Sequence, residues 1–203
     1  MLKSFKQLGE PDGCELMQDI FERKATYADL EAVPPHLVAE LLCGKLVTHP
    51  RPAPAHAVAA ASLTMDLGGP YQKGRGGPGG WIFMTEPELH FGEDVTVPEL
   101  AGWKLERMSA MPPKAYIEVA PDWLCEVLSP STEKYDRGDK REIYARAGVR
   151  HLWLLDPRIQ CLEAFALTEG RWLLLGTYSG DQVVRIAPFE DVEIQLAQLW
   201  PLG

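Results

Sequence analysis

Two glutamates in otherwise apolar segments are the first candidates for chemistry in this chain. Glu126 falls within residues 122–128, where both alternating faces are apolar, so we expect it on a central strand that is covered on both sides. Glu99 shares a face with Val97 and Ala101 in another expected strand. A buried carboxylate needs a cation or hydrogen-bond donors, because an unpaired buried charge is very costly. Glu126 therefore indicates either a functional site or a structural salt bridge.

Acids on neighbouring strands could hold one divalent cation between them. Mg²⁺ prefers hard oxygen ligands, and the backbone carbonyl of Val127 would supply a further oxygen beside Glu99 and Glu126. Asp122 is a poorer partner for Glu126, since four residues along one strand span about 13 Å at ~3.3 Å per residue. Glu40 also lies among apolar residues, and it either completes a two-metal carboxylate cluster or faces solvent.

A helix expected over residues 133–147 carries the candidate cation. Asp136, Lys140 and Tyr144 are spaced four residues apart, so they form one stripe on that helix. Lys140 would fold back over the end of the Glu126 strand, where it would orient an attacking water or stabilise negative charge on a phosphoryl group. The alternative is an Asp136–Lys140 surface pair that contributes only about a few tenths of a kcal/mol.

The N-terminal part of the chain is expected to form a short helix, a hairpin and a longer helix. A capping-box pattern begins a helix over about 26–32. Two short apolar runs in residues 38–47 flank a Cys-Gly pair, which indicates a tight hairpin; a helix that ends at Gly44 is the competing interpretation. The helix over 56–67 opens with His56, which either helps to line a site or is a partly exposed capping-region residue.

The remaining segments indicate one α/β domain with a mixed β-sheet flanked by helices. Residues 68–80 are too rich in Gly and Pro for a regular element, so we expect a mobile connector, or a phosphate cradle formed with Lys73 and Arg75. The hydroxyls in 129–132 are expected to cap the helix that follows. The strand-like segments are 81–84, 88–91, 95–103, 121–129, 151–156 and a hairpin of 159–167 with 171–177, and the tail adds a strand or a short helix.

Length and composition describe a folded protein of ordinary size. The chain has 203 residues, of which 46% are hydrophobic and 24% charged, so a lead-in over 1–24 and a single domain over 25–203 are expected. No apolar stretch approaches the ~20 residues of a membrane span and no signal-peptide pattern is visible, so a soluble cytoplasmic protein with no membrane partner is expected. The net charge of -9 argues against a general nucleic-acid coat, and cysteine and histidine spacing argues against a zinc ribbon or an HExxH site.

The order of several motifs resembles a known family. The motifs are AELLCGKLV, a helix opened by His56, VPEL, EVLSPST, the Asp136–Lys140–Tyr144 spacing and a final GV-x-HLWLLDP. Over roughly residues 25–165 the chain resembles the Uma family of restriction endonucleases, within the PD-(D/E)XK nuclease superfamily. The resemblance implies a restriction-endonuclease-like core, phosphodiester hydrolysis dependent on Mg²⁺ or Mn²⁺, DNA as the partner, and a homodimer.

The resemblance also implies roles for particular residues. Glu126 stands where the family has the acid of its (D/E)XK strand, and Leu128 stands where the lysine of that motif would be. The lysine of the family is displaced to the following helix, which makes Lys140 the candidate, and Glu40 matches the family's glutamate in its N-terminal hairpin. Glu99 replaces the aspartate expected after proline, so its carboxylate reaches further by about one C–C bond, a shift that matters where positioning matters.

The leading hypothesis is a metal-dependent endodeoxyribonuclease. Glu99, Glu126, Lys140 and Glu40 are its catalytic candidates, the metal ligands are Glu99, Glu126, Val127 and Glu40, and the supporting residues are Asp136, Tyr144 and His56. A catalytically impaired nuclease fold that acts as a DNA-binding or assembly module is the second hypothesis, motivated by Glu99 and the acidic charge. A small phosphohydrolase acting on nucleotides is the third.

Overall fold

The computed structural model describes residues 23–51 and 53–200. Its centre is a six-stranded sheet in the order β10-β9-β8-β7-β6-β3, in which β7 and β8 are parallel and the other neighbours are antiparallel. The strands are β3 (Trp81–Thr85), β6 (Leu100–Lys104), β7 (Trp123–Val127), β8 (His151–Asp156), β9 (Cys161–Thr168) and β10 (Arg171–Ser179). This mixed sheet confirms the expected α/β fold class.

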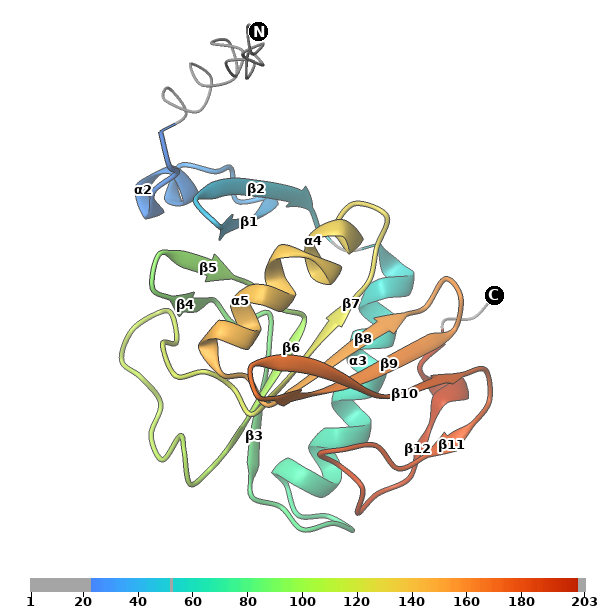
Figure 1. Cartoon of the computed structure of the whole chain (residues 1–203). Coiled ribbons are helices and arrows are strands. Elements are labelled where there is room, and N and C mark those ends of the chain that lie inside the picture. The colour runs from blue at the N-terminus through green and yellow to red at the C-terminus, as the bar shows by residue number, and fades with distance from the viewer. Residues whose placement is uncertain (1–22, 52, 201–203) are drawn as a thin grey trace, which may run out of the picture.

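Helices cover both faces of this sheet, as Figure 1 shows. The parallel pair β7–β8 requires a crossover connection, which α4 (Glu133–Arg137) and α5 (Asp139–Ala147) provide on one face. The other face is covered by α3 (Pro54–Leu67), which begins near the end of β7 that leads into α4. The carboxyl end of β7 therefore lies close to the amino end of α3 and to the loop that enters α4.

Alternation along β7 divides the core into two layers. Trp123, Cys125 and Val127 pack with the apolar face of α3, whereas Leu124 and Leu128 pack with α5. All of these side chains are buried, as is Glu126 between them, so the expectation of a central strand covered on both sides is confirmed. Glu126 therefore lies on the α5 side of the sheet.

A second, smaller sheet packs above the first in the order β2-β1-β5-β4. It is built from β1 (Leu37–Leu42), β2 (Lys45–Pro50), β4 (Leu89–Phe91) and β5 (Asp94–Thr96). β1 and β2 form a tight hairpin whose two central residues, Cys43 and Gly44, have φ of 52° and 80°. The hairpin is confirmed, and the alternative of a helix that ends at Gly44 is wrong. The short helix α2 (Tyr27–Glu31) begins with the expected capping box.

Four expectations about local structure are wrong, each for a local physical reason. The single strand expected over 95–103 is interrupted at 97–99, because the Pro98 ring lacks an N–H to donate, and β5 and β6 join different sheets. Residues 68–80 are not wholly irregular, since Gly68–Gln72 forms the π-helix η1. The helix expected over 133–147 is divided at Gly138, and Thr132 makes no side-chain cap at the start of α4.

The C-terminal part confirms the β9–β10 hairpin and closes with short elements. The tail contains the paired strands β11 (Val183–Val184) and β12 (Ile194–Gln195), followed by the 3-10 helix η2 (Leu196–Gln198). Most of the lead-in expected over 1–24 lies outside the described residues, so the division into a lead-in and one domain stays a prediction. None of the helices in the described ranges is long and apolar enough for a bilayer span.

Candidate active site

The pairing of β6 with β7 brings two acids side by side. Leu100 is opposite Cys125, so the same register extended by one residue places Glu99 opposite Glu126. Their carboxyl groups lie within hydrogen-bonding reach of each other. A carboxylate has no proton to donate, so this contact is favourable only when one group is protonated or when a cation lies between the two.

A buried lysine contacts three carboxyl groups, one of which belongs to Glu126. The amine of Lys140 lies 2.8 Å from Glu126 Oε1, 3.1 Å from Glu40 Oε1 and 3.2 Å from Asp136 Oδ1. All four side chains are buried. The surface ion pair considered for Asp136 and Lys140 is therefore wrong, because both groups lie in the interior. Glu40 does not face solvent, and it reaches this lysine from the hairpin of the smaller sheet.

Glu126 and Glu40 each have a second contact that fixes the carboxyl group in place. The hydroxyl of Tyr144 donates to Glu126 Oε1 at 2.5 Å, and the backbone N–H of Val97 donates to Glu40 Oε1 at 2.8 Å. The spacing of Asp136, Lys140 and Tyr144 thus serves one interior site even though Gly138 divides the helix. The stripe predicted on residues 136–144 is present in spite of that division.

His56 holds the end of β7 together with Glu99. Its Nε2 lies 2.6 Å from the carbonyl oxygen of Val127 and 3.1 Å from Glu99 Oε1, while Glu99 Oε2 accepts a hydrogen bond from the Val127 N–H at 3.1 Å. The side chain of His56 is buried. It lines the site, and the alternative of a partly exposed capping-region residue is wrong.

The charge balance around this cluster shifts several pKa values. Four carboxyl groups, those of Glu40, Glu99, Glu126 and Asp136, surround a single lysine. Burial raises the pKa of Glu126 well above its usual range, against the attraction of Lys140. Burial also acts to raise the pKa of Glu99, but hydrogen bonds with His56 and Glu126 and the charge of Lys140 outweigh it and lower that pKa to about 2.

Opposing influences therefore act on the two neighbouring acids: burial raises the pKa of Glu126, whereas hydrogen bonds and nearby positive charge lower the pKa of Glu99. The pKa of Lys140 is raised well above its usual range because the charges of Glu126 and Glu40 outweigh the effect of burial, so the amine stays positive. An excess of acid in a water-excluded place is the arrangement that a bound cation relieves.

Oxygen donors at the end of β7 fit a hard divalent ion. Glu126 Oε2 is buried and has no hydrogen-bond partner among the described residues, and the Val127 carbonyl keeps a second lone pair beside His56. Glu99 completes a set of two carboxylates and one carbonyl, a set that leaves further positions to water, as Mg²⁺ prefers. Glu40 Oε1 lies 3.1 Å from the Lys140 amine, and within 23–51 and 53–200 no group of three or more His, Cys, Asp or Glu side chains is placed to hold a metal.

A pocket of about 210 Å³ opens beside Glu99. It lies between the end of β2, the start of α3 and the loop from β7 to α4. Its walls are His49, Pro50, Arg51, Ala53, His56, Glu99, Ser129, Pro130, Ser131 and Thr132. His49 was not predicted as a site residue from the sequence, and its Nε2 lies 3.6 Å from Glu40 Oε2. The available signal was the pairing of the two hairpin strands, which places His49 opposite Val38 and close to Glu40.

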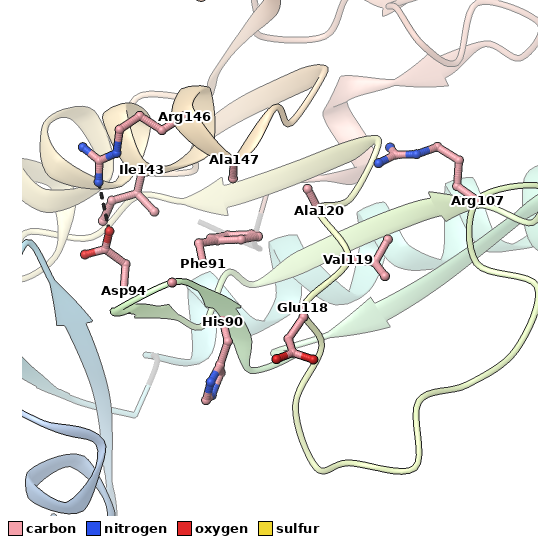
Figure 2. A pocket seen from close by; sticks show the side chains of 11 residues that line it. His90, Phe91, Asp94, Arg107, Glu118, Val119, Ala120, Ile143, Arg146 and Ala147 are labelled. Atoms are coloured by element: carbon pink, nitrogen blue, oxygen red, sulfur yellow. Dashed lines mark hydrogen bonds and ion pairs between the residues drawn. The ribbon is translucent and has the colours of Figure 1, made fainter.

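A larger pocket, of about 660 Å³, lies elsewhere, and none of the predicted site residues line it. Figure 2 shows it between the β4–β5 turn, the end of α5 and residues 118–120. Its two arginines are already paired, Arg146 with Asp94 at 2.9 Å and Arg107 with Asp122 at 2.8 Å. Asp122 is buried in that pair at the opposite end of β7, as its distance from Glu126 along the strand led us to expect.

Comparison with known proteins gives the family of this mixed α/β protein. The family model Uma2, described as "Putative restriction endonuclease", matches residues 25–197, so the chain belongs to this family. A solved structure from Anabaena variabilis, described as a "putative nuclease belonging to DUF820", is similar with a TM-score of 0.70 and 19% identity, over 87% of this chain and 97% of that chain. Among the curated proteins compared, none matches.

Proposed function

We propose that the protein is a divalent-metal-dependent nuclease that hydrolyses phosphodiester bonds of DNA. One observation carries this proposal: Glu99 and Glu126 lie side by side at the end of β7, and the amine of Lys140 lies 2.8 Å from Glu126. Family membership and the similar fold support a nuclease, and DNA, the metal ion and the residue roles are our proposal.

Glu99, Glu126 and the Val127 carbonyl are the groups we propose to hold Mg²⁺ or Mn²⁺. The unpartnered oxygen of Glu126 and its position opposite Glu99 in the extended β6–β7 register support this choice. A bound divalent ion would supply Lewis acidity toward the phosphate and would lower the pKa of a bound water. Glu40 matches the hairpin glutamate of the family, but its contacts favour the role of holding Lys140.

The side chains of the chain itself supply position and charge. The amine of Lys140 is fixed by three carboxyl groups, so it presents a positive charge beside Glu126, where it stabilises charge that develops on the phosphoryl oxygens. Tyr144 holds one oxygen of Glu126, which leaves the other free for a ligand. His56 binds the Val127 carbonyl and Glu99 together, so it orients both donors.

Plasmid cleavage with titrated Mg²⁺ or Mn²⁺ tests the proposal. The wild type should nick or linearise DNA, and Glu126→Ala should abolish this, because it removes a ligand and the partner of Lys140. Glu142→Ala is the matched control, since Glu142 is exposed on α5. Equal cleavage by the wild type and Glu126→Ala, or no cleavage with any ion, would contradict the proposal.

One observation favours the second candidate, a nuclease fold that binds DNA or assembles without cutting. Both oxygens of Glu99 are occupied, one by the Val127 N–H and the other by His56, in the place where the family pattern has a shorter aspartate. DNA binding that is unaffected by EDTA, without nicking, would support this candidate.

A homodimer and a cytoplasmic location belong to the same proposal. Both follow from the family resemblance and the sequence pattern. Light scattering on the purified protein measures the mass in solution, and a mass of one chain at all concentrations would contradict the dimer. Cell fractionation tests the location, and recovery in the membrane fraction would contradict it.

A further inference from the structure

The pocket beside Glu99 has the chemistry of a site for one nucleic-acid backbone unit. Its volume of about 210 Å³ is below the ~300–1,000 Å³ of pockets that hold drug-sized molecules. Two prolines, Pro50 and Pro130, give it apolar walls, and a deoxyribose presents C–H groups that such walls contact. The pocket therefore fits a sugar with its phosphate better than a base pair.

Three hydroxyl groups lie together in the wall of this pocket. Ser129 Oγ lies 2.9 Å from Ser131 Oγ and 3.0 Å from Thr132 Oγ1. These hydroxyls do not cap α4, because Thr132 makes no side-chain cap. Ser131 is exposed, and its hydroxyl contacts only Ser129 among the described residues, so it can rotate to donate to an incoming oxygen.

An arginine stands at the same opening. The side chain of Arg51 is 60% exposed, and its polar contacts with the described part of the chain are long, 3.7 Å to Glu86 and 3.4 Å to the carbonyl of Pro35. A guanidinium so weakly held can turn to bind a phosphate through two parallel hydrogen bonds. Arg51 lines the same pocket as His49, His56 and Glu99, so its side chain lies beside the carboxylate site.

We propose that this pocket binds one backbone phosphate of the strand that is cut, next to the scissile bond, through Arg51 and the hydroxyls of Ser129 and Ser131. The assignment rests on the proposed nuclease function. Contacts from a guanidinium and hydroxyls position a strand without reading its sequence. No Phe, Tyr or Trp is among the described lining residues, so stacking on a base is not part of the interaction.

Binding without cleavage provides the first test. The affinity of the full chain for a short single-stranded oligonucleotide and for its duplex is measured by fluorescence anisotropy in EDTA, over a range of salt. The slope of log K against log salt is negative, and losing one phosphate contact reduces its magnitude by about 0.7 for single strands and about 0.9 for duplex. Arg51→Ala should make the slope less steep by that amount. Arg75→Ala should leave it unchanged, since Arg75 follows η1, at the end of α3 opposite to His56.

Neutral phosphates locate the contact on the strand. In oligonucleotides with a single methylphosphonate moved along the backbone, one position should weaken binding by the wild type about as much as Arg51→Ala does. The same position should have no effect in Arg51→Ala. Inorganic phosphate at equal concentration should not compete, which distinguishes a strand unit from a free anion.

Cleavage kinetics provide the third readout. Arg51→Ala and Ser131→Ala should raise KM by about 5- to 30-fold with kcat retained, because the contact is equal in the ground and transition states. Arg51→Lys should bind more tightly than Arg51→Ala but less tightly than the wild type, since lysine keeps the positive charge and cannot donate two parallel hydrogen bonds. Ser109→Ala, at an exposed serine in the loop after β6, is the matched control for Ser131→Ala.

The outcomes separate the two proposals. If the wild type cleaves DNA but Arg51→Ala changes neither KM, nor the salt slope, nor the methylphosphonate profile, the pocket assignment is overturned and the nuclease function stands. If the wild type never cleaves, but the slope and the profile respond to Arg51→Ala, the phosphate contact in the pocket stands, whereas the nuclease function and the placement next to a scissile bond both fail.

Discussion

Replacing Lys140 with methionine tests most fully whether the amine of this buried lysine holds the carboxyl groups around it. Methionine keeps the length and most of the volume of the side chain, so packing changes little. It removes the positive charge from between Glu40, Glu126 and Asp136, whose oxygens lie 3.1, 2.8 and 3.2 Å from the amine. Three buried acids are then left without their shared partner.

The expected cost follows from that burial. Removing one partner of a buried ion pair costs about 3–5 kcal/mol, because the remaining charge is uncompensated. For a domain of this size, ~1 kcal/mol corresponds to about 2–4 °C in Tm, so Lys140→Met should melt roughly 6–20 °C below the wild type. Lys134→Met is the matched control: Lys134 is exposed on α4, and its replacement should change stability by less than about 0.5 kcal/mol.

The pH dependence of that cost has a definite sign. The pKa of Glu126 is already raised by burial, so the folded state takes up a proton there more readily than the unfolded chain. Stability from such a group is present at low pH and is lost as pH rises through the folded pKa. Loss of the amine raises the acid pKa values further, so the destabilisation of Lys140→Met should be larger near about pH 8 than near about pH 5.

Thermal unfolding at these two pH values, with and without Mn²⁺, is the assay. A divalent ion should recover part of the lost Tm in Lys140→Met, because a bound ligand stabilises the folded state by mass action and supplies the missing positive charge. DNA cleavage should be lost in the same variant. A Tm within about 2 °C of the wild type at both pH values, together with retained cleavage, would refute the reasoning.

Three further predictions concern residues around the site. Tyr144→Phe should lower the free energy of unfolding by about 1.5–3 kcal/mol in a urea titration, because Glu126 loses a hydrogen-bond donor at 2.5 Å; an unchanged midpoint would contradict this. Asp122→Asn should cost about 1–3 kcal/mol, because the buried side chain loses a charge-assisted hydrogen bond from Arg107, which is itself 29% exposed, yet the cleavage rate per folded molecule should equal that of the wild type. Gly102→Ala should cost about 1–3 kcal/mol by overpacking, since a Cβ there would lie 2.7 Å from an aromatic carbon of β3; a stability equal to the wild type by thermal melting would count against it.

The local part of the site could be predicted from the sequence. Alternation along residues 122–128 identified a buried glutamate on a central strand, and a spacing of four placed Asp136, Lys140 and Tyr144 on one side of the following segment. Both patterns depend only on neighbours within a few residues. The break at Gly138 divides the helix, but Asp136, Lys140 and Tyr144 remain buried on the same side.

The contacts between distant segments could not be predicted in this way. Whether Glu40 faced solvent or a cluster depended on how the β1–β2 hairpin packs over the main sheet, and no local pattern contains that information. The partnership of Glu99 with Glu126 depended on the β6–β7 register, which pairing across some 25 intervening residues determines. The strand pattern placed Glu99 and Glu126 on expected neighbouring strands that share one cation, and the family resemblance added the match of Glu40 to the hairpin glutamate.

Irregular segments account for the remaining errors. Apolar residues around Val97 favoured one continuous strand, although Pro98 by itself fits an edge, a strand end or a bulge. The Val97 N–H donates to Glu40 and the proline cannot donate to a sheet, so the strand ends there. The hydroxyls of 129–132 matched a capping pattern, yet they bond to one another at the pocket wall. In both segments a contact with the site replaces the local structure that the pattern favoured.

A crystal structure of the full chain soaked in Mn²⁺ tests the central claim most directly. We expect one anomalous peak at the end of β7, at about 2.0–2.2 Å from oxygens of Glu99 and Glu126 and from the Val127 carbonyl. We also expect Lys140 to keep its contact with Glu126 beside that peak. No peak there at saturating Mn²⁺, or a peak only in the larger pocket between Asp94 and Glu118, would contradict the account.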